Sequence, residues 1–237
     1  MFQTDPFSLI VLFVGLSLLP FVAMVATSYL KIVVVMSLIR NALGIQSIPP
    51  NMVINALAMI LTFYIMAPMA SESWNIAKAE LAKAHKSSAT AAATATASYQ
   101  PPTTNSFFET DAIVKAAEPF RTFLSSHTSD RERAFFVNTA ERLWAKDPDE
   151  LATVDPESFY ILIPSFCVSE LTKAFQIGFL VYLPFIAIDI IVSNILLAMG
   201  MMMVSPVTIS LPFKLLLFVM VNGWTLLVQG LIRGYVI

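Results

Sequence analysis

Two long hydrophobic regions flank a polar region in the middle of the chain. Residues 1–70 and 158–237 are predominantly apolar, whereas residues 71–157 carry most of the charged side chains and both histidines. Uncharged runs such as Phe7–Leu30 and Met52–Ala70 are long enough to cross a bilayer core of about 30 Å. The pattern predicts an all-α integral membrane protein of kinked helical hairpins, at 1–70 and 158–237, with a small helical polar domain at 71–157 between them.

Prolines and glycines predict where these helices bend or end. Pro20 lies inside the first apolar run and predicts a kink there, and Pro184 predicts one in the C-terminal half. Gly44 is a plausible helix terminator, and Asn51 is a candidate N-cap for the next helix. Because apolar residues continue almost to Arg40, the first hydrophobic unit is longer than one span and should bend.

The polar region predicts short helices separated by a linker. Ser71–Lys86 is rich in Ala, Glu and Lys, and extends the second apolar helix outward. The Ala/Thr/Ser tract at 87–106 has few large apolar residues, which predicts a flexible linker. Phe107–Leu124 and Asp130–Lys146 then place apolar residues at helical spacing, which predicts small helices with one shared apolar face.

An apolar link at Leu196–Lys214 joins the two arms of the C-terminal hairpin. Its Met-rich loop, residues 200–206, contains Met201, Met202 and Met203 in succession. Methionine is unbranched and polarizable, so a cluster of methionines can repack around surfaces of different shape. The cluster suits a gate that seals against ions yet deforms around a passing chain; packing filler or a lipid-facing surface is the commoner role for such residues.

The few charged residues of the apolar regions are candidates for contacts. Glu170 and Lys173 stand three apart and are neighbours on a helix. Asp189 lies alone in an apolar run, where an unpaired carboxylate costs about 3 kcal/mol. It therefore needs a partner, a wet cavity or another subunit. An ion-coupled transporter that uses Asp189 as a proton carrier is one alternative that follows from this residue.

Composition adds exclusions to this interpretation. The chain is 57% hydrophobic and only 13% charged, as in integral membrane proteins. A net charge of −2 provides no basic field for nucleic acid. The single Cys167 and the two histidines show no metal-binding spacing, and no catalytic motif occurs. We expect no enzyme, no cofactor and no metal site, which leaves a transporter, a channel subunit, a scaffold for other membrane proteins or part of a secretion gate.

Several blocks of the sequence resemble the FliP/SctR family of core export-gate proteins of type III secretion systems. These blocks are Arg40–Gly44, Pro49–Asn51, Phe63–Pro68, Pro164–Phe166, Ser169–Leu171, Ala174–Phe179, Pro184–Asp189, Gly200–Val204 and Leu211–Lys214. The resemblance covers nearly the whole chain. The tract at 87–106 departs from it. The start of the chain lacks the basic residues of a cleavable signal peptide, which favours the injectisome form over the flagellar form.

The resemblance implies a function and a set of roles. It implies a homopentamer that assembles with two smaller membrane proteins, of the FliQ/SctS and FliR/SctT types, into a pore for unfolded proteins in the bacterial inner membrane. The polar domain would lie on the periplasmic side, and lipid would contact part of the apolar surface. Met201, Met202 and Met203 would form a gasket around the channel, and Glu170, Lys173, Asp189 and Arg40 would make subunit contacts.

Overall fold

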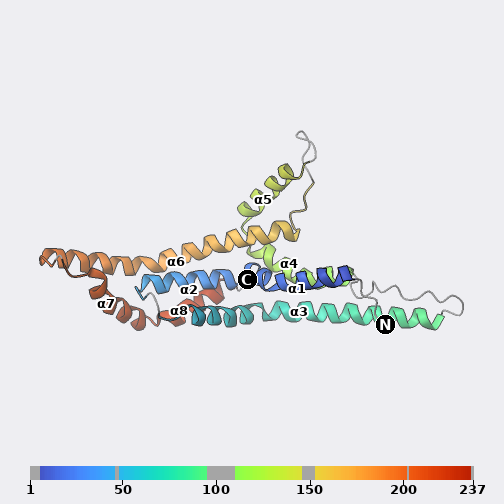
Figure 1. Ribbon diagram of the computed structural model, residues 1–237, viewed down its shortest axis with the longest axis horizontal. Coiled ribbons are helices and arrows are strands. Elements are labelled where there is room, and N and C mark those ends of the chain that lie inside the picture. The colour runs from blue at the N-terminus through green and yellow to red at the C-terminus, as the bar shows by residue number, and fades with distance from the viewer. Residues whose placement is uncertain (1–5, 46–47, 95–109, 146–152, 202, 236–237) are drawn as a thin grey trace.

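The structure is a computed structural model, and it describes residues 6–45, 48–94, 110–145, 153–201 and 203–235. These residues form helices, and no strand occurs among them, which confirms the all-α prediction (Figure 1). In chain order the helices are α1 (Pro6–Val25), α2 (Tyr29–Ala42), α3 (Asn51–Thr94), α4 (Thr110–His127), α5 (Asp130–Leu143), α6 (Phe159–Ala198), α7 (Pro206–Met220) and α8 (Gly223–Arg233).

Helices α3 and α6 form the long axis of the molecule (Figure 1). At 1.5 Å per residue, the 40 residues of α6 reach about 60 Å, roughly twice a bilayer core. By length and composition, α6 and the segment Asn51–Glu80 of α3 can each cross a membrane. Two bent pairs, α1 with α2 and α7 with α8, bring the number of candidate spans within the described residues to as many as four.

Helix α2 is the centre of the main hydrophobic core. Its side chains Ile32, Val35, Met36 and Ile39 are fully buried. They belong to one cluster with apolar residues of α3, α6, α7 and α8. Gly178 of α6 allows the closest approach, because a β-carbon there would lie 3.2 Å from Cβ of Leu38 on α2. The packing of these apolar faces holds the two hydrophobic regions together as one body.

Two bends lie at breaks between helices. The first hydrophobic unit bends by 54° between Val25 and Tyr29, which confirms the prediction that this unit bends. Pro20 stands inside α1, and the kink predicted there stays a prediction. A second bend of 59° separates α7 from α8, where Asn222 adopts a left-handed conformation with φ of +51°. The sequence pattern had indicated no break there.

Helix α3 joins the first hydrophobic region to the polar region. It runs through residue 70 without a break and continues to Thr94, as the predicted outward extension at Ser71–Lys86 requires, and residues 87–94 of the predicted flexible tract are also helical. Residues 95–106 of that tract lie outside the described residues. Helix α4 packs on α3 and α6, and α5 packs on α6.

The expectation of one apolar face shared by the small helices is also corrected. The α4 residues Phe120, Phe123 and Leu124 pack against the start of α6 in one cluster. The α5 residues Phe136, Val137 and Ala140 pack against Ile161 of α6 in another. The start of α6 is therefore the common support of the two polar-region helices.

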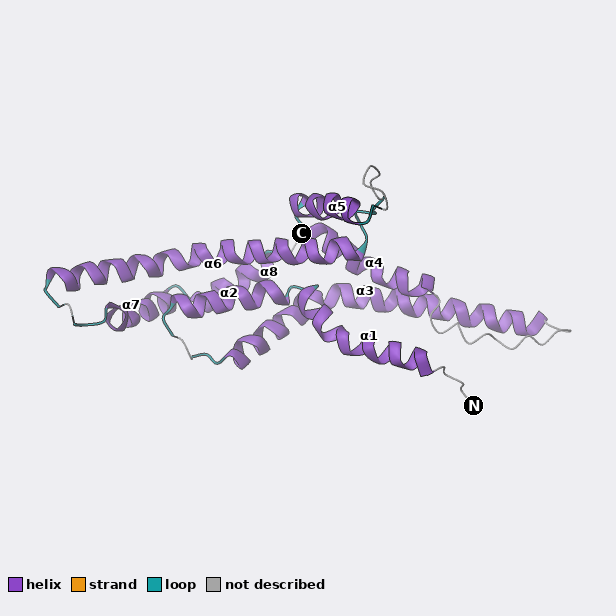
Figure 2. Cartoon of the chain, turned by 45° about the horizontal axis from the view of Figure 1, so that its top comes forward, coloured by secondary structure: helices purple, strands orange, loops and turns teal. Residues whose placement is uncertain are grey.

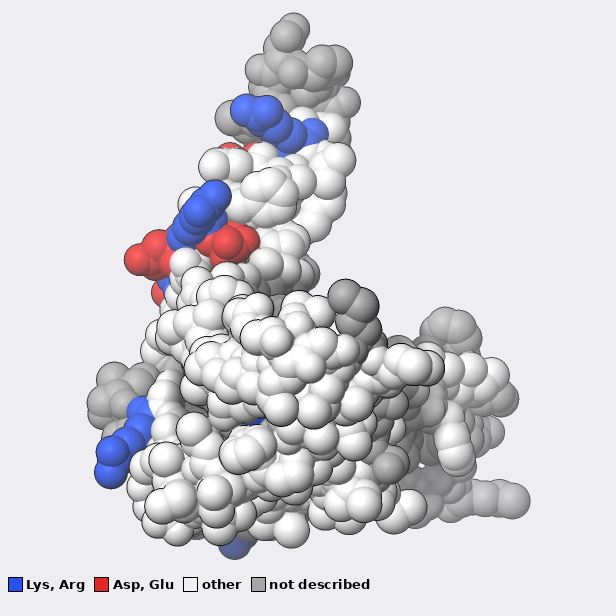
Figure 3. Space-filling model, turned by 90° about the vertical axis from the view of Figure 1, so that its left-hand side faces the viewer, with Lys and Arg blue, Asp and Glu red and all other residues white. Residues whose placement is uncertain are grey.

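The α2–α3 and α6–α7 links lie toward one end of the molecule, the far part of α3 extends to the other, and α5 projects sideways between them (Figures 1 and 2). Seen from the α6–α7 end, the body has few charged side chains on its surface, and charges concentrate on the projecting part (Figure 3). On this face, the charged side chains therefore lie mainly on the projecting part (Figure 3).

Candidate functional site

The methionine-rich loop begins at a tight helix end. The amide of Gly200 donates to the carbonyl of Leu197 and that of Met201 to the carbonyl of Leu196, both at 3.0 Å. Gly200 has φ of +72°, a conformation that costs glycine little and other residues more. This is the Schellman arrangement that ends many helices. Because Pro206 then opens α7, the loop is confined between two fixed helix ends.

The described methionines of this loop do not pack into the core of the chain. Met203 is fully exposed, and 42% of Met201 is exposed. Met202 lies outside the described residues. The role of packing filler within this chain therefore does not apply to Met201 and Met203. The roles that remain for Met201 and Met203 are contact with lipid, with another copy of the chain or with a transported chain.

Asp189 has a partner within the chain. Its carboxylate lies 2.6 Å from Nζ of Lys214 on α7 and accepts a 2.6 Å hydrogen bond from the hydroxyl of Ser210. Lys214 is almost completely buried, and a third of the Asp189 side chain is exposed. The pair offsets the cost of placing each charge among apolar residues. The predicted need of Asp189 for a partner is thus met by α7.

The same lysine reaches a third helix. Nζ of Lys214 donates to the carbonyl of Ala42, the last residue of α2, at 3.2 Å. The last carbonyls of a helix lack partners within it and carry partial negative charge, so a cation is favourable at this position. Lys214 therefore ties α2, α6 and α7 together at the end that carries the methionine loop.

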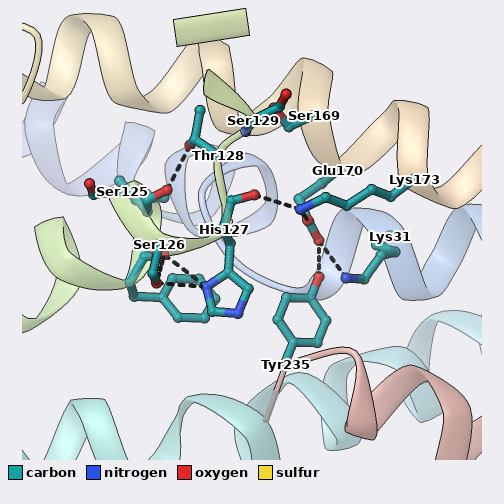
Figure 4. Close-up of polar contacts among 12 residues, drawn as sticks. Lys31, Ser125, Ser126, His127, Thr128, Ser129, Ser169, Glu170, Lys173 and Tyr235 are labelled. Carbon is teal, nitrogen blue, oxygen red and sulfur yellow. Dashed lines mark hydrogen bonds and ion pairs between the residues drawn. The ribbon is translucent and has the colours of Figure 1, made fainter. Parts of the chain in front are cut away.

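A second buried cluster surrounds Glu170 on α6 (Figure 4). Its carboxylate pairs with Nζ of Lys31 on α2 at 2.9 Å and with Nζ of Lys173 at 3.1 Å. The hydroxyl of Tyr235, beyond the end of α8, also donates to Glu170. Glu170 is fully buried. Each oxygen of its carboxylate has a partner, as a buried charge requires.

Lys173 extends this cluster to the turn between α4 and α5. Its Nζ donates to the carbonyl of His127 at 2.6 Å, and the amide of Ser129 donates to Oγ of Ser169 at 3.0 Å. The predicted proximity of Glu170 and Lys173 is therefore confirmed. Lys173 also donates to the last carbonyl of α4, and the sequence spacing of Glu170 and Lys173 does not indicate this contact.

Two groups outside the apolar helices respond to this environment. Burial holds the pKa of His127 below its usual range. Burial also raises the pKa of Tyr235 strongly, with a further rise from the nearby Glu170 charge. The phenol of Tyr235 therefore stays protonated and remains a donor to Glu170.

Arg40 braces the link between α2 and α3. One guanidinium nitrogen donates to the carbonyl of Pro49 at 3.3 Å and to the side-chain oxygen of Asn51. Asn51 is the first residue of α3, and the carbonyl of Pro50 before it accepts the first amide bonds. The Asn51 side chain thus binds Arg40, which corrects the N-cap prediction.

The predicted site residues fall into separate places. Glu170 and Lys173 lie in one cluster, Asp189 in the other, Arg40 in the α2–α3 link, and the methionines at the α6–α7 link. Sequence reasoning missed the partners Lys31, Ser210, Lys214 and Tyr235. A signal existed for the two lysines, because a cation in an apolar region needs an anion, and Glu170 and Asp189 are the acids within the long apolar runs.

Neither cluster has the composition of a catalytic or metal site. Each pairs carboxylate with ammonium, which leaves few free ligand oxygens. Across the described ranges, no group of three or more His, Cys, Asp or Glu side chains lies close enough to hold a metal ion. The arrangement suits the fastening of helices to one another.

Comparisons with known proteins agree with this architecture. The chain is 47% identical to the Yop proteins translocation protein R of Yersinia pestis over 98% of its own length and 97% of that protein. It is 44% identical to the hypersensitivity response secretion protein HrcR of Ralstonia nicotianae, over 96% of each chain. It is also 39% identical to the flagellar biosynthetic protein FliP of Bacillus subtilis, over 96% of its length and 90% of that protein. Residues 12–231 match the FliP family, so this chain belongs to the FliP family.

Proposed function

We propose that this chain is an export-gate subunit of an injectisome-type III secretion system in the bacterial inner membrane. The observation that carries this proposal is full-length similarity to proteins named for translocation and secretion. Relatives named for Yop protein translocation, hypersensitivity response secretion or virulence are 42–47% identical, whereas two flagellar FliP relatives are 37% and 39% identical. This difference favours the injectisome over the flagellar form.

The mechanism we propose is physical rather than enzymatic. Copies of the chain surround a pore, and Met201, Met202 and Met203 of each copy meet at its constriction. Thioether side chains bend easily and fill irregular gaps, so they seal around an unfolded chain and close behind it. The exposure of Met201 and Met203 supports this role, because both side chains are available to a neighbour.

The assembly we propose is a homopentamer with two smaller export-apparatus membrane proteins. The large exposed apolar side chains of α3, α6, α7 and α8 support the burial of this chain against other membrane components and lipid. Arg40, Glu170, Lys173 and Asp189 then act by fixing the surfaces that neighbours contact. The polar region, residues 71–157, would face the periplasm.

The alternative hypothesis, an ion-coupled transporter that uses Asp189, has less support. A proton carrier must gain and lose its proton during a cycle, whereas Asp189 already has a lysine at 2.6 Å and a serine donor. These partners give the carboxylate a structural role. We therefore do not propose ion-coupled transport by this residue.

The gasket is tested by replacing all three methionines with alanine in the complete secretion complex. We expect normal assembly and greater leakage of ions across vesicles that contain the complex. Met220→Ala is the matched control, because Met220 is also exposed but lies at the opposite end of α7.

Two results separate the gasket from the wider function. If the triple variant seals as tightly as the parent, the gasket role is wrong. If deletion of the chain leaves secretion intact, the export-gate function itself is wrong.

A further inference from the structure

The turn between α4 and α5, His127–Asp130, is held to the rest of the molecule at a small number of points. The carbonyl of His127 accepts the hydrogen bond from Lys173, and the amide of Ser129 donates to Ser169. The third point is the His127 ring, whose centroid lies 5.2 Å from that of Tyr235 (Figure 4). His127 is 7% exposed, so its ring is part of the packing.

The contacts of the ring identify which nitrogen carries the proton. Nδ1 of His127 lies 2.9 Å from the carbonyl oxygen of Phe123, which can only accept. Nδ1 therefore bears the hydrogen, and in the neutral ring Nε2 bears none. The ring also packs on Phe123, with centroids 4.5 Å apart. This neutral form places an aromatic surface between Phe123 and Tyr235.

Charged groups surround this ring from several helices. Lys31 of α2 and Lys173 of α6 both pair with Glu170, and Nζ of Lys31 lies over the ring of Tyr235, 3.5 Å from its centroid. The Glu170 carboxylate is already engaged by both lysines and by Tyr235. A proton on His127 would therefore place a third positive charge, after those of Lys31 and Lys173, beside the one Glu170 carboxylate, which is already paired.

The other charged groups near His127 are exposed to water or already hydrogen-bonded to other groups. Glu72 and Glu118 line the groove between α3 and α4 into which His127 also opens, and both are exposed to water, which screens their charge. Arg133 of α5 donates to the carbonyl of Ser125 at 2.5 Å and adds positive charge near the turn. The pKa of His127 is held low by burial first, and Lys173 and Lys31 lower it further against the opposing effects of the Phe123 carbonyl and Glu170.

We propose that His127 is a proton-controlled latch. Its neutral ring holds the α4–α5 turn against α6 and the C-terminal segment, and uptake of a proton releases that turn. The groove between α3 and α4 gives water access to the ring. No part of this proposal depends on the export-gate function.

The direction of the effect follows from linkage. An exposed histidine has a pKa near 6.5, and the closed latch disfavours the protonated ring. The closed latch therefore has its full stability above that pH, and it loses stability as pH falls from about 6.5 toward the lower pKa of the closed state. At pH 5.5 the protonated form of an exposed histidine outnumbers the neutral form by about ten to one. The ratio of open to closed latch therefore rises by up to about tenfold relative to its value well above pH 6.5.

The test uses hydrogen exchange of the full chain purified in detergent. Peptides covering residues 123–133 are compared between the parent and His127→Gln at the same pH, because the intrinsic exchange rate cancels in that comparison. Glutamine is polar and of similar length, and it does not titrate. For each pH we take the ratio of the exchange rate of the parent to that of His127→Gln. We expect this ratio to be larger at pH 5.5 than at pH 7.5. His85→Gln, which removes the other histidine of the sequence, should behave as the parent does.

If His127→Gln does not fold, a second measurement on another variant tests the proposal. In His85→Gln the sole histidine is His127, so its ring resonance needs no further assignment. We expect that resonance to titrate below the usual histidine range, together with loss of protection at 123–133. A titration at or above the usual range overturns the latch. So does a pH response of equal size in His127→Gln and the parent.

Discussion

Nζ of Lys214 lies 2.6 Å from Oδ2 of Asp189, although the methionine loop separates the two residues along the chain. Helices α6 and α7 are thereby joined close to the loop they carry. A lysine that is almost completely buried depends on such a partner, since an isolated ammonium in an apolar setting is costly.

The first prediction concerns this pair. Lys214→Met should destabilise the chain by about 1–3 kcal/mol, less than for fully buried pairs because Asp189 is partly exposed. Asp189→Asn should have a similar effect, and the double variant should lose less than the two single losses combined. Thermal unfolding of the purified protein in detergent measures this cycle. Strictly additive losses would show that the two residues act independently.

The second prediction concerns the hydroxyl of Tyr235. Tyr235→Phe removes one donor from the buried Glu170 carboxylate, and hydrogen bonds to charged groups contribute about 1.5–3 kcal/mol. We expect a loss of stability in that range. Tyr64→Phe is the control, because Tyr64 is well exposed on α3. Equal stability of the two variants would contradict the assigned bond.

The third prediction concerns Glu170 itself. Glu170→Gln leaves Lys31 and Lys173 beside a neutral group, and breaking a buried pair from one side costs about 3–5 kcal/mol. The loss should exceed that of Tyr235→Phe in the same unfolding assay. Glu118→Gln, where the carboxylate is about half exposed, should change stability by less than about 1 kcal/mol.

The fourth prediction concerns the approach of α2 and α6. Gly178→Val should weaken their packing, because the added atoms meet Leu38, whereas Gly230→Val meets nothing within 4 Å of the new β-carbon. We expect a loss of about 1–3 kcal/mol for the first change and a small effect for the second. The melting temperature of the isolated chain in detergent distinguishes them. A larger loss for Gly230→Val would argue against this contact.

Parts of the fold followed directly from local patterns. The long apolar runs predicted α3 and α6, and the spacing of Glu170 and Lys173 predicted their contact. Both depend on residues near one another in sequence. The length of the first apolar unit predicted that it bends, but the local pattern did not mark the break before Tyr29.

The partners of the buried charges could not be chosen in the same way. Asp189 had several candidate cations, and the geometry that selects Lys214 depends on how α7 folds back on α6. Tyr235 lies 65 residues from Glu170, and nothing in its neighbourhood marks it as a donor to a carboxylate. Long-range packing decides such pairs, and one sequence does not contain that information in a local form.

Helix α6 carries both buried acids, Glu170 and Asp189, about 28 Å apart along its axis. Through Lys31 the first acid is joined to the beginning of α2, and through Lys214 the second is joined to the last residue of α2. The two helices are therefore cross-braced at both ends of α2, so α6 cannot slide along α2 without separating a buried ion pair.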